Sequence, residues 1–291
     1  TLDFFGSGKM YRVLPRQIQD TDFASLMHET GIGLPEILPD KKTVRETSRY
    51  LTKEVFPALR KLPVKAAVAF RLKTQLLFSM LLEADKAFLA VKQPALYLKK
   101  TRRTWNSNWI DRKIGTPENT AVNQLRQKAR KAVQHKIMEN NQISLYSLTA
   151  PTGLGKTLLA ADWALKIREH TEKQAQLPPK VIIVLPFLSI IDQTAKVYRE
   201  LLSMGSEKPD GSWFLTSHSL SNREYDTELE ENITNFFIDT WRTELVITTY
   251  DQFLMSLIDT RARYQMRFHN LCDSLIIMDE VQSVPCRMWQ L

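Results

Sequence analysis

A phosphate-binding pattern between an apolar run and a helical stretch constrains this chain more than any other feature. Residues 150–157 read Ala-Pro-Thr-Gly-Leu-Gly-Lys-Thr, which fits GxxxxGK[ST] with Ala in place of the first Gly. The apolar run Leu145–Thr149 precedes the pattern, and helical spacing follows it. Gly153 and Gly155 allow the backbone to curl so that successive N–H groups point at one anion. We therefore expect a phosphate to bind at the start of a helix.

Each residue of this loop has a predicted place in binding ATP and magnesium. Lys156 is expected to reach the β- and γ-phosphate oxygens as a point charge, and the Thr157 hydroxyl to ligate magnesium. A bare Gly-rich turn is the simpler interpretation, but Gly-Lys-Thr in this context disfavours it. The predicted nucleotide-binding residues are Ala150, Pro151, Thr152, Gly153, Leu154, Gly155, Lys156 and Thr157.

From Ser144 onward, short apolar runs alternate with helical patterns. This alternation indicates an α/β fold with a parallel sheet covered on both faces. Strands are predicted at Leu145–Thr149, Val181–Leu185, Trp213–Thr216, Leu245–Thr249 and Ser274–Met278. Helices are predicted between most of them, at Thr157–Glu169, Ile190–Met204, Leu229–Phe237 and Gln252–Ile258.

A second motif carries two carboxylates at the end of the last predicted strand. Asp279 and Glu280 follow the apolar run there, and ligands bind at the carboxyl ends of strands in open α/β sheets. Asp279 is predicted to hold magnesium, and Glu280 to orient and deprotonate the water that attacks the γ-phosphate. An acidic pair after a strand is common by chance. Combined with the phosphate loop, it predicts Lys156, Asp279 and Glu280 as catalytic residues.

Two weaker segments each follow a predicted strand and open a helix. They are Pro186–Gln193 and Thr248–Phe253. Hydroxyl and amide groups beside free helix-start N–H groups suit nucleic-acid phosphates. The alternative is ordinary helix capping by Ser189, Thr249 or Asp251, which in isolation is the better interpretation of each. The predicted nucleic-acid contacts are Ser189, Gln193, Thr248 and Thr249.

The amino-terminal half is predicted to be largely helical. Apolar residues at helical spacing predict one strong helix with a buried face made of Leu72, Leu76, Leu77, Met80, Leu81, Ala84 and Phe88. A second helix is expected at about 120–139, after Pro117. Residues 95–118 between them, rich in Lys, Arg, Asn and Trp, are interpreted as an extended connector.

Charge and composition narrow the partners and the compartment. The net charge is +8, and residues 92–136 contain twelve Lys and Arg but two acidic residues. This excess of positive charge suits binding to nucleic acid. A solvated linker is the simpler alternative. The longest apolar run, Val181–Ile191, is too short to span a bilayer. No secretory leader is visible, and Cys272 and Cys286 are interpreted as reduced thiols. We therefore expect a cytoplasmic location and no membrane partner.

In order, APTGLGKT, PFLSIIDQ, TTYDQF and DEVQ resemble motifs I, Ia, Ic and II of superfamily 2 helicases. The resemblance covers about residues 119–291. The sequence most resembles the CRISPR-associated helicase–nuclease of type I interference systems. Three segments carry this resemblance: Asn123–Arg126, the form of motif Ia, and Arg267–Leu271 before motif II. It implies a RecA-like P-loop domain that uses ATP and magnesium. Gln282 ends motif II where many relatives have His or Asp.

Residues 76–85 resemble the last conserved helix of that family's HD nuclease domain, in which the Asp at the place of Asp85 is a metal ligand. The resemblance therefore implies a divalent transition metal in the intact protein. A surface carboxylate is the alternative for Asp85, and the upstream His and His-Asp pair of an HD site are not found here. The implied division is a helical HD part at 1–95, a basic linker at 96–118, and the first RecA-like domain at 119–291.

By resemblance, the intact protein is an ATP-driven helicase and translocase on single-stranded DNA, coupled to a DNase and recruited by a guide-RNA surveillance complex. Because the chain begins with Thr1 and ends at Leu291 soon after motif II, we expect an internal fragment. The alternatives are another superfamily 2 motor, restriction-type or acting on RNA, and a non-catalytic nucleic-acid-binding module. That module would stack bases on Trp105 and Trp109 within the basic segment.

We expect this chain to bind nucleotide but to hydrolyse it negligibly. The arginines that stabilise the transferring phosphoryl group lie, by resemblance, in a second RecA-like domain, and such arginines contribute about 10³–10⁵ in rate in related NTPases. Phosphate release measured with and without single-stranded DNA tests this expectation. Substantial DNA-stimulated turnover by this chain would contradict it.

Overall fold

The computed structural model describes residues 41–91, 102–139, 145–174, 176–205, 213–217 and 231–284. The chain divides into two compact units, Thr1–Lys73 and Thr74–Leu291. The boundaries expected from the resemblance, at residues 95 and 118, stay predictions. Cys272 is a free, exposed thiol, and Cys286 lies outside the described residues.

The described part of the first unit is helical. It contains α4 (Lys41–Tyr50), η1 (Leu51–Val55) and α5 (Phe56–Arg60). The long helix α6 (Val64–Ala90) begins in the first unit and continues into the second. The strong helix predicted around residues 72–88 is therefore confirmed.

The predicted buried face of this helix is wrong for the part of α6 that lies in the second unit. Leu77 and Leu81 are 68% and 66% exposed, whereas Gln75, Ser79 and Glu83 are buried. These three polar residues recur every four positions and so share one face of the helix. That face is buried because other parts of the second unit supply hydrogen-bond partners for the three polar side chains. These hydrogen bonds offset the free-energy cost of burying polar groups.

In the described residues of the second unit, four parallel strands form a sheet in the order β2-β3-β1-β4. They are β1 (Lys180–Leu185), β2 (Phe214–Ser217), β3 (Leu245–Thr249) and β4 (Ser274–Met278). The two central strands, β1 and β3, are buried throughout, which explains why they are apolar at nearly every position. The predicted α/β class and four of the five predicted strands are confirmed.

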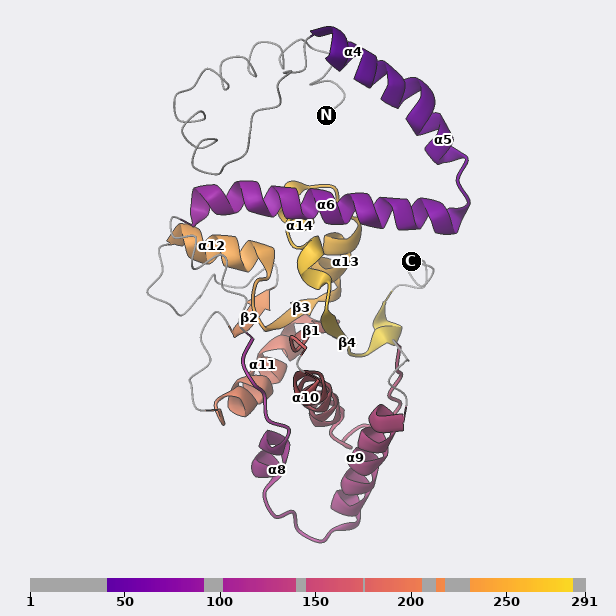
Figure 1. Cartoon of the computed structure of the whole chain (residues 1–291). Helices are drawn as coiled ribbons and strands as arrows, with labels where there is room; N and C mark the ends of the chain where they lie inside the picture. Colours follow the sequence, from indigo (N-terminus) through magenta and orange to yellow (C-terminus); the bar gives the residue numbers. More distant parts are fainter. Residues whose placement is uncertain are drawn as a thin grey trace. The chain divides into compact units, whose positions relative to one another are not determined.

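Helices cover both faces of this sheet (Figure 1). One face packs on α8 (Asn108–Ile114), α10 (Lys156–Lys173) and α11 (Leu188–Leu202), in a core that includes Leu165, Ile183 and Ile191. The other face packs on α12 (Glu231–Thr240) and α13 (Tyr250–Ile258), with Trp241 and Phe253 at its centre. The helix α9 (Ala121–Glu139) packs against α10 and confirms the helix predicted at 120–139. Three layers of this kind are a RecA-like arrangement.

The predicted strand Leu145–Thr149 is wrong. The segment has neither strand nor helix structure, and Leu145 is 86% exposed. An apolar run indicates only a tendency to extend, and a strand forms only where a neighbouring strand supplies hydrogen bonds. In the described residues, the neighbours of β1 are β3 and β4, which leaves the segment unpaired in this structure.

The interpretation of residues 95–118 as an extended connector is also wrong over its described part. Trp105, Trp109 and Ile110 are buried in the core beside α10 and α11, and α8 occupies the middle of the segment. Large apolar side chains at this spacing contribute their area to the core. The two tryptophans are therefore unavailable as stacking platforms for bases.

A buried carboxylate ties this segment to the sheet. Glu244, just before β3, accepts a hydrogen bond from the Arg103 backbone N–H at 3.0 Å. It also forms ion pairs with the guanidinium groups of Arg103, at 3.2 Å, and Arg168, at 2.7 Å. Burial lowers the pKa of Arg168, on α10, to about 10, so its guanidinium stays charged at neutral pH. Three segments distant in sequence converge on one buried anion.

Three short elements complete the described second unit: α14 (Ala262–Gln265), η2 (Phe268–Leu271) and η3 (Val281–Ser283). The last two flank β4 in the chain, and Asp279 and Glu280 lie between β4 and η3. Among the helices that the structure describes, none combines the length and the apolar character needed to cross a bilayer.

Replacing Glu244 by Ala is expected to lower the free energy of unfolding by about 3–5 kcal/mol, because it leaves the buried Arg168 guanidinium unpaired. Urea unfolding followed by far-UV circular dichroism measures the change. The matched control is Glu200→Ala, whose exposed ion pair with Lys113 should leave the urea midpoint almost unchanged. Equal, small effects of both substitutions would contradict the role given to Glu244.

Candidate functional site: a phosphate loop beside an acidic strand end

The predicted phosphate loop has the local conformation that its sequence requires. Gly153 and Gly155 have φ angles of 81° and 87°, in the left-handed region that residues with a Cβ rarely adopt. α10 begins at Lys156 directly after Gly155, so the N–H groups of its first turn are available for an anion. Both features of the predicted loop are confirmed, although the described residues just before it, 145–149, form no strand.

An arginine from α9 braces the loop from outside. The Arg126 guanidinium donates through Nη2 and Nε to the Gly153 carbonyl, at 2.7 and 3.2 Å, and through Nη1 to Asn123 Oδ1 at 3.1 Å. The next N–H, that of Leu154, donates to the Pro151 carbonyl at 3.4 Å and so closes a turn within the loop. Sequence reasoning linked Asn123–Arg126 to this loop only by resemblance, and the contact itself has no sequence signal.

The acidic pair stands at the carboxyl end of β4. The Asp279 N–H donates to the Val184 carbonyl at 3.0 Å and so extends the pairing of β4 with β1. The Tyr250 hydroxyl donates to the Asp279 carbonyl at 2.9 Å. Burial, with the nearby carboxylates of Asp279 and Glu280, raises the pKa of Tyr250 to about 12. Tyr250 therefore stays protonated and can hold the backbone of Asp279 in place at any physiological pH.

Glu280 has a left-handed backbone, with φ 50° and ψ 48°. Residues other than Gly, Asn and Asp seldom adopt this conformation, and such strained positions gather at functional sites. The Glu280 N–H donates to the Asp279 side chain, Oδ1, at 3.0 Å. The turn therefore separates the two carboxylates: Asp279 bonds back to the chain, while Glu280 points toward the phosphate loop.

The tertiary structure brings the loop and the acidic pair into contact. Lys156 Nζ lies 3.1 Å from Glu280 Oε1, and the Gln282 side-chain amide donates to Glu280 Oε2. The hydrogen bonds from Lys156 and Gln282 lower the pKa of Glu280. In this state Lys156 is paired with a carboxylate at the place where it is expected to meet phosphate. A bound phosphate must therefore take the lysine from Glu280.

The residues present fit ATP and magnesium. The two left-handed glycines form a backbone cradle, and Lys156 and the start of α10 add positive charge to it. Thr157 in the first turn of α10 and Asp279 at the end of β4 offer oxygen atoms, the ligands that magnesium prefers. Sequence reasoning identified these residues by their pattern, but their proximity comes from the sheet.

The four predicted nucleic-acid contacts differ in accessibility. Ser189 and Gln193 are exposed on α11. Thr248 is fully buried, and its hydroxyl donates to the Ser217 carbonyl at 2.7 Å. Thr249 is the N-cap of α13, where its hydroxyl accepts from the Gln252 N–H at 3.4 Å. The capping alternative is thus confirmed for Thr249, whereas Ser189 lies inside α11 and is not its cap.

Asp85 lies on an exposed part of α6. Its carboxylate is 66% exposed and 3.9 Å from Lys86 Nζ. Within the described residues, no group of three or more His, Cys, Asp or Glu gathers in a way that could hold a metal ion. The metal-ligand role that the resemblance implies for Asp85 stays a prediction.

Comparison with known proteins supplies the family. The model of the family described as "Type III restriction enzyme, res subunit" matches residues 117–289. The chain belongs to this family. Its match begins just before α9 and covers the phosphate loop, the sheet and the acidic pair, so the geometry described above is that of the family's domain. The chain therefore carries a superfamily 2 helicase domain, as its motifs predicted.

A curated relative gives a second comparison. The protein named CRISPR-associated nuclease/helicase Cas3, from Haloferax volcanii, is 32% identical to this chain over 154 residues. The alignment covers 49% of this chain but 16% of the relative's length. It confirms the resemblance to the CRISPR-associated helicase family over the aligned part. What the rest of that protein does is not carried over with it.

The contact between Lys156 and Glu280 predicts opposite effects of two substitutions on nucleotide affinity. Lys156→Ala should weaken binding of a fluorescent ADP analogue roughly 10–100-fold, because a charged hydrogen bond to phosphate is lost. Glu280→Gln should strengthen binding up to about fivefold, because it frees Lys156 from a partly exposed competing ion pair. Lys173→Ala, at the exposed far end of α10, is the control. Weaker binding by Glu280→Gln would contradict the competition.

Proposed function

We propose that this chain is the ATP-binding half of an ATP-dependent helicase that translocates on single-stranded DNA in type I CRISPR interference. In the intact protein this motor is coupled to a DNA nuclease and recruited by a guide-RNA surveillance complex. The observation that carries the proposal is the 3.1 Å contact between Lys156 of the phosphate loop and Glu280 of the acidic pair. The name of the Haloferax volcanii relative supports the choice of pathway.

The described residues divide the work of ATP hydrolysis. The N–H groups of Gly153 and of residues 155–157 bind the phosphates, and Lys156 moves from Glu280 to the β- and γ-phosphate oxygens. Thr157 and Asp279 would hold magnesium, which neutralises phosphate charge when bound. Freed from Lys156, Glu280 regains basicity and accepts the proton of the attacking water. Gln282 still holds its second oxygen and keeps the carboxylate oriented.

The proposed DNA contact involves α11. Ser189 and Gln193 lie on its exposed first turns, where side-chain donors and helix-start N–H groups suit a phosphate backbone. The hydroxyls of Thr248 and Thr249 already have partners within the domain. We therefore limit the proposed side-chain contact to Ser189 and Gln193.

The nuclease part of the proposal rests on Asp85. Its exposed carboxylate is available on α6, and in the intact protein it would ligate the divalent transition metal of an HD site together with residues outside the described part. A restriction-type translocase on duplex DNA is the second candidate, because the matching family is described by a restriction enzyme subunit. Their substrates distinguish the two.

Fluorescence anisotropy of labelled oligonucleotides tests the proposal on this chain. Single-stranded DNA should bind more tightly than duplex DNA, and a non-hydrolysable ATP analogue should change its affinity in the wild type but not in Lys156→Ala. The double variant Ser189→Ala/Gln193→Ala should bind single strands roughly tenfold more weakly, as expected for two lost hydrogen bonds.

Ser203→Ala, at the opposite end of α11, is the control and should bind like the wild type. A preference for duplex DNA would favour the restriction-type motor. Binding that ignores the nucleotide would overturn the motor and favour a simple nucleic-acid-binding module.

A further inference from the structure

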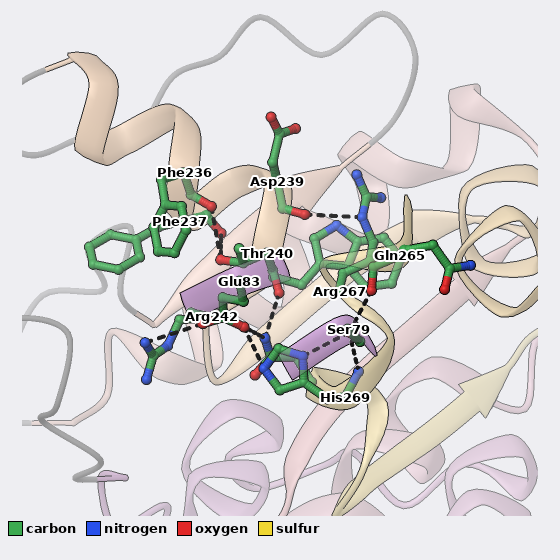
Figure 2. A network of polar contacts seen from close by, with 12 residues as sticks. Ser79, Glu83, Phe236, Phe237, Asp239, Thr240, Arg242, Gln265, Arg267 and His269 are labelled. Carbon is green, nitrogen blue, oxygen red and sulfur yellow. Dashed lines mark hydrogen bonds and ion pairs between the residues drawn. The ribbon is translucent and has the colours of Figure 1, made fainter. Parts of the chain in front are cut away.

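Two segments with no role in the proposed ATP hydrolysis contact each other through a buried network of hydrogen bonds and ion pairs. They are residues 76–85 of α6 and residues 267–271, which lead into β4. Figure 2 shows the side chains of Ser79 and Glu83 beside the imidazole of His269. Ser79 and Glu83 are 0% and 1% exposed, so each of their polar atoms requires a partner inside the protein.

The hydrogen bonds of Ser79 determine the protonation of one His269 nitrogen. Ser79 Oγ donates its single hydrogen to the Gln265 carbonyl at 2.5 Å and accepts from the His269 backbone N–H at 3.0 Å. His269 Nδ1 lies 2.8 Å from the same oxygen. Because the hydroxyl hydrogen is already donated, Nδ1 must carry a hydrogen and donate it to the remaining lone pair.

Glu83 contacts the other ring nitrogen of His269. Its carboxylate is paired with Arg242 Nη1 at 3.3 Å and accepts from Asn270 Nδ2 at 2.7 Å, and its Oε2 contacts His269 Nε2. His269 is therefore held at both ring nitrogens, by Ser79 and by Glu83, which lie on one face of α6.

The order Ser79–His269–Glu83 resembles a hydrolase triad, but it cannot act as one. The Ser79 hydroxyl is fully buried and its hydrogen is donated to Gln265, so it is neither accessible to a substrate nor available to a base. Both ring nitrogens of His269 are already engaged inside the protein, by Ser79 Oγ and Glu83 Oε2. The network is structural, and what matters is the element that it holds.

The network holds the amino end of β4. Its partners His269 and Asn270 lie in η2, and Asn270 also donates to the Thr240 carbonyl at 3.0 Å. β4 begins three residues after η2 and, in the described residues, pairs only with β1. A short strand hydrogen-bonded on one side depends on its ends for its position. Asp279 stands directly after the other end of this strand.

A second contact from α6 reaches the same aspartate by another route. Gln75 Nε2 donates to the Leu257 carbonyl at 3.0 Å and so holds the last turn of α13. The first residue of α13 is Tyr250, whose hydroxyl donates to the Asp279 carbonyl. One face of α6 thus braces both structures that locate Asp279, namely β4 and α13.

We propose that Ser79 and Glu83 are positioning residues for the proposed magnesium ligand Asp279, acting through the His269 ring, through Asn270 and through β4. This inference rests on the proposed ATP- and magnesium-binding function. The two residues touch neither nucleotide nor metal. They set how well the Asp279 carboxylate meets magnesium, without changing the phosphate loop, whose partners are Arg126 and Glu280.

The test separates metal-dependent from metal-independent nucleotide binding. The affinity of a fluorescent ADP analogue is measured in excess magnesium and again in EDTA, for the wild type, Ser79→Ala and Glu83→Gln. Both variants should bind within about twofold of the wild type in EDTA. Magnesium increases the affinity for the nucleotide, and in both variants this increase should be roughly tenfold smaller. A tenfold change corresponds to the loss of about one charged hydrogen bond. Asp279→Asn should lose the same gain, and Lys86→Ala, exposed on the same helix, should keep it.

Two outcomes would overturn the positioning role. One is an unchanged magnesium gain in both variants. The other is a parallel loss in magnesium and in EDTA, which would mean that the network only stabilises the fold. Failure of the wild type to bind the nucleotide at all would instead overturn the proposed function.

A measurement on the wild type covers the case in which the variants do not fold. The ¹⁵N chemical shifts of the His269 ring should show that Nδ1 carries a hydrogen, because Nδ1 donates to Ser79 Oγ. A bare Nδ1 would overturn the network on which the positioning role depends.

Discussion

The pairing of β4 with β1 is the interaction on which the rest of this structure depends. It runs in parallel from Lys180 opposite Ser274 to Val184 opposite Met278, and the Asp279 N–H extends it by one more bond. Because the strands are parallel, their carboxyl ends share one edge of the sheet. α10 packs on the sheet with its first residue, Lys156, near that edge. A shift of β4 by one residue would reverse its side chains and separate Glu280 from the lysine.

Buried charge holds the elements around this sheet in place. Glu244 gathers Arg103 and Arg168 before β3, and Glu83 gathers Arg242 and His269 before β4. Each carboxylate has several donors, which is the condition under which a buried ion is tolerated. Both lie before the strands, away from the acidic pair that follows β4. The two ends of the strands therefore differ. The charge pairs at the amino ends hold the fold together, whereas at the carboxyl ends the ion pair between Lys156 and Glu280 can be replaced by one with phosphate.

Much of the candidate site could be predicted from the sequence, because its residues belong to local motifs. The phosphate loop needs glycines at 153 and 155 for its backbone angles, and the acidic pair follows an apolar strand. The partners of these motifs could not be predicted in the same way. Arg126 on the Gly153 carbonyl and Tyr250 on the Asp279 carbonyl are contacts between distant segments, and neither spacing nor composition encodes them. Two of the errors, at Leu145–Thr149 and on the face of α6, came from interpreting apolar runs without their partners.

The sequence by itself determined the α/β class, four strands, the loop conformation and the residue types present at the candidate site. These depend on backbone sterics and on periodicity, which act between near neighbours in the chain. Only the tertiary structure decided that Trp105 and Trp109 belong to the core, that Ser79 and Glu83 are buried in place of leucines, and that Lys156 is held by Glu280. These outcomes depend on which distant groups can satisfy a buried hydrogen bond or charge. Those partners come from distant parts of the sequence, so they are defined only in the folded chain.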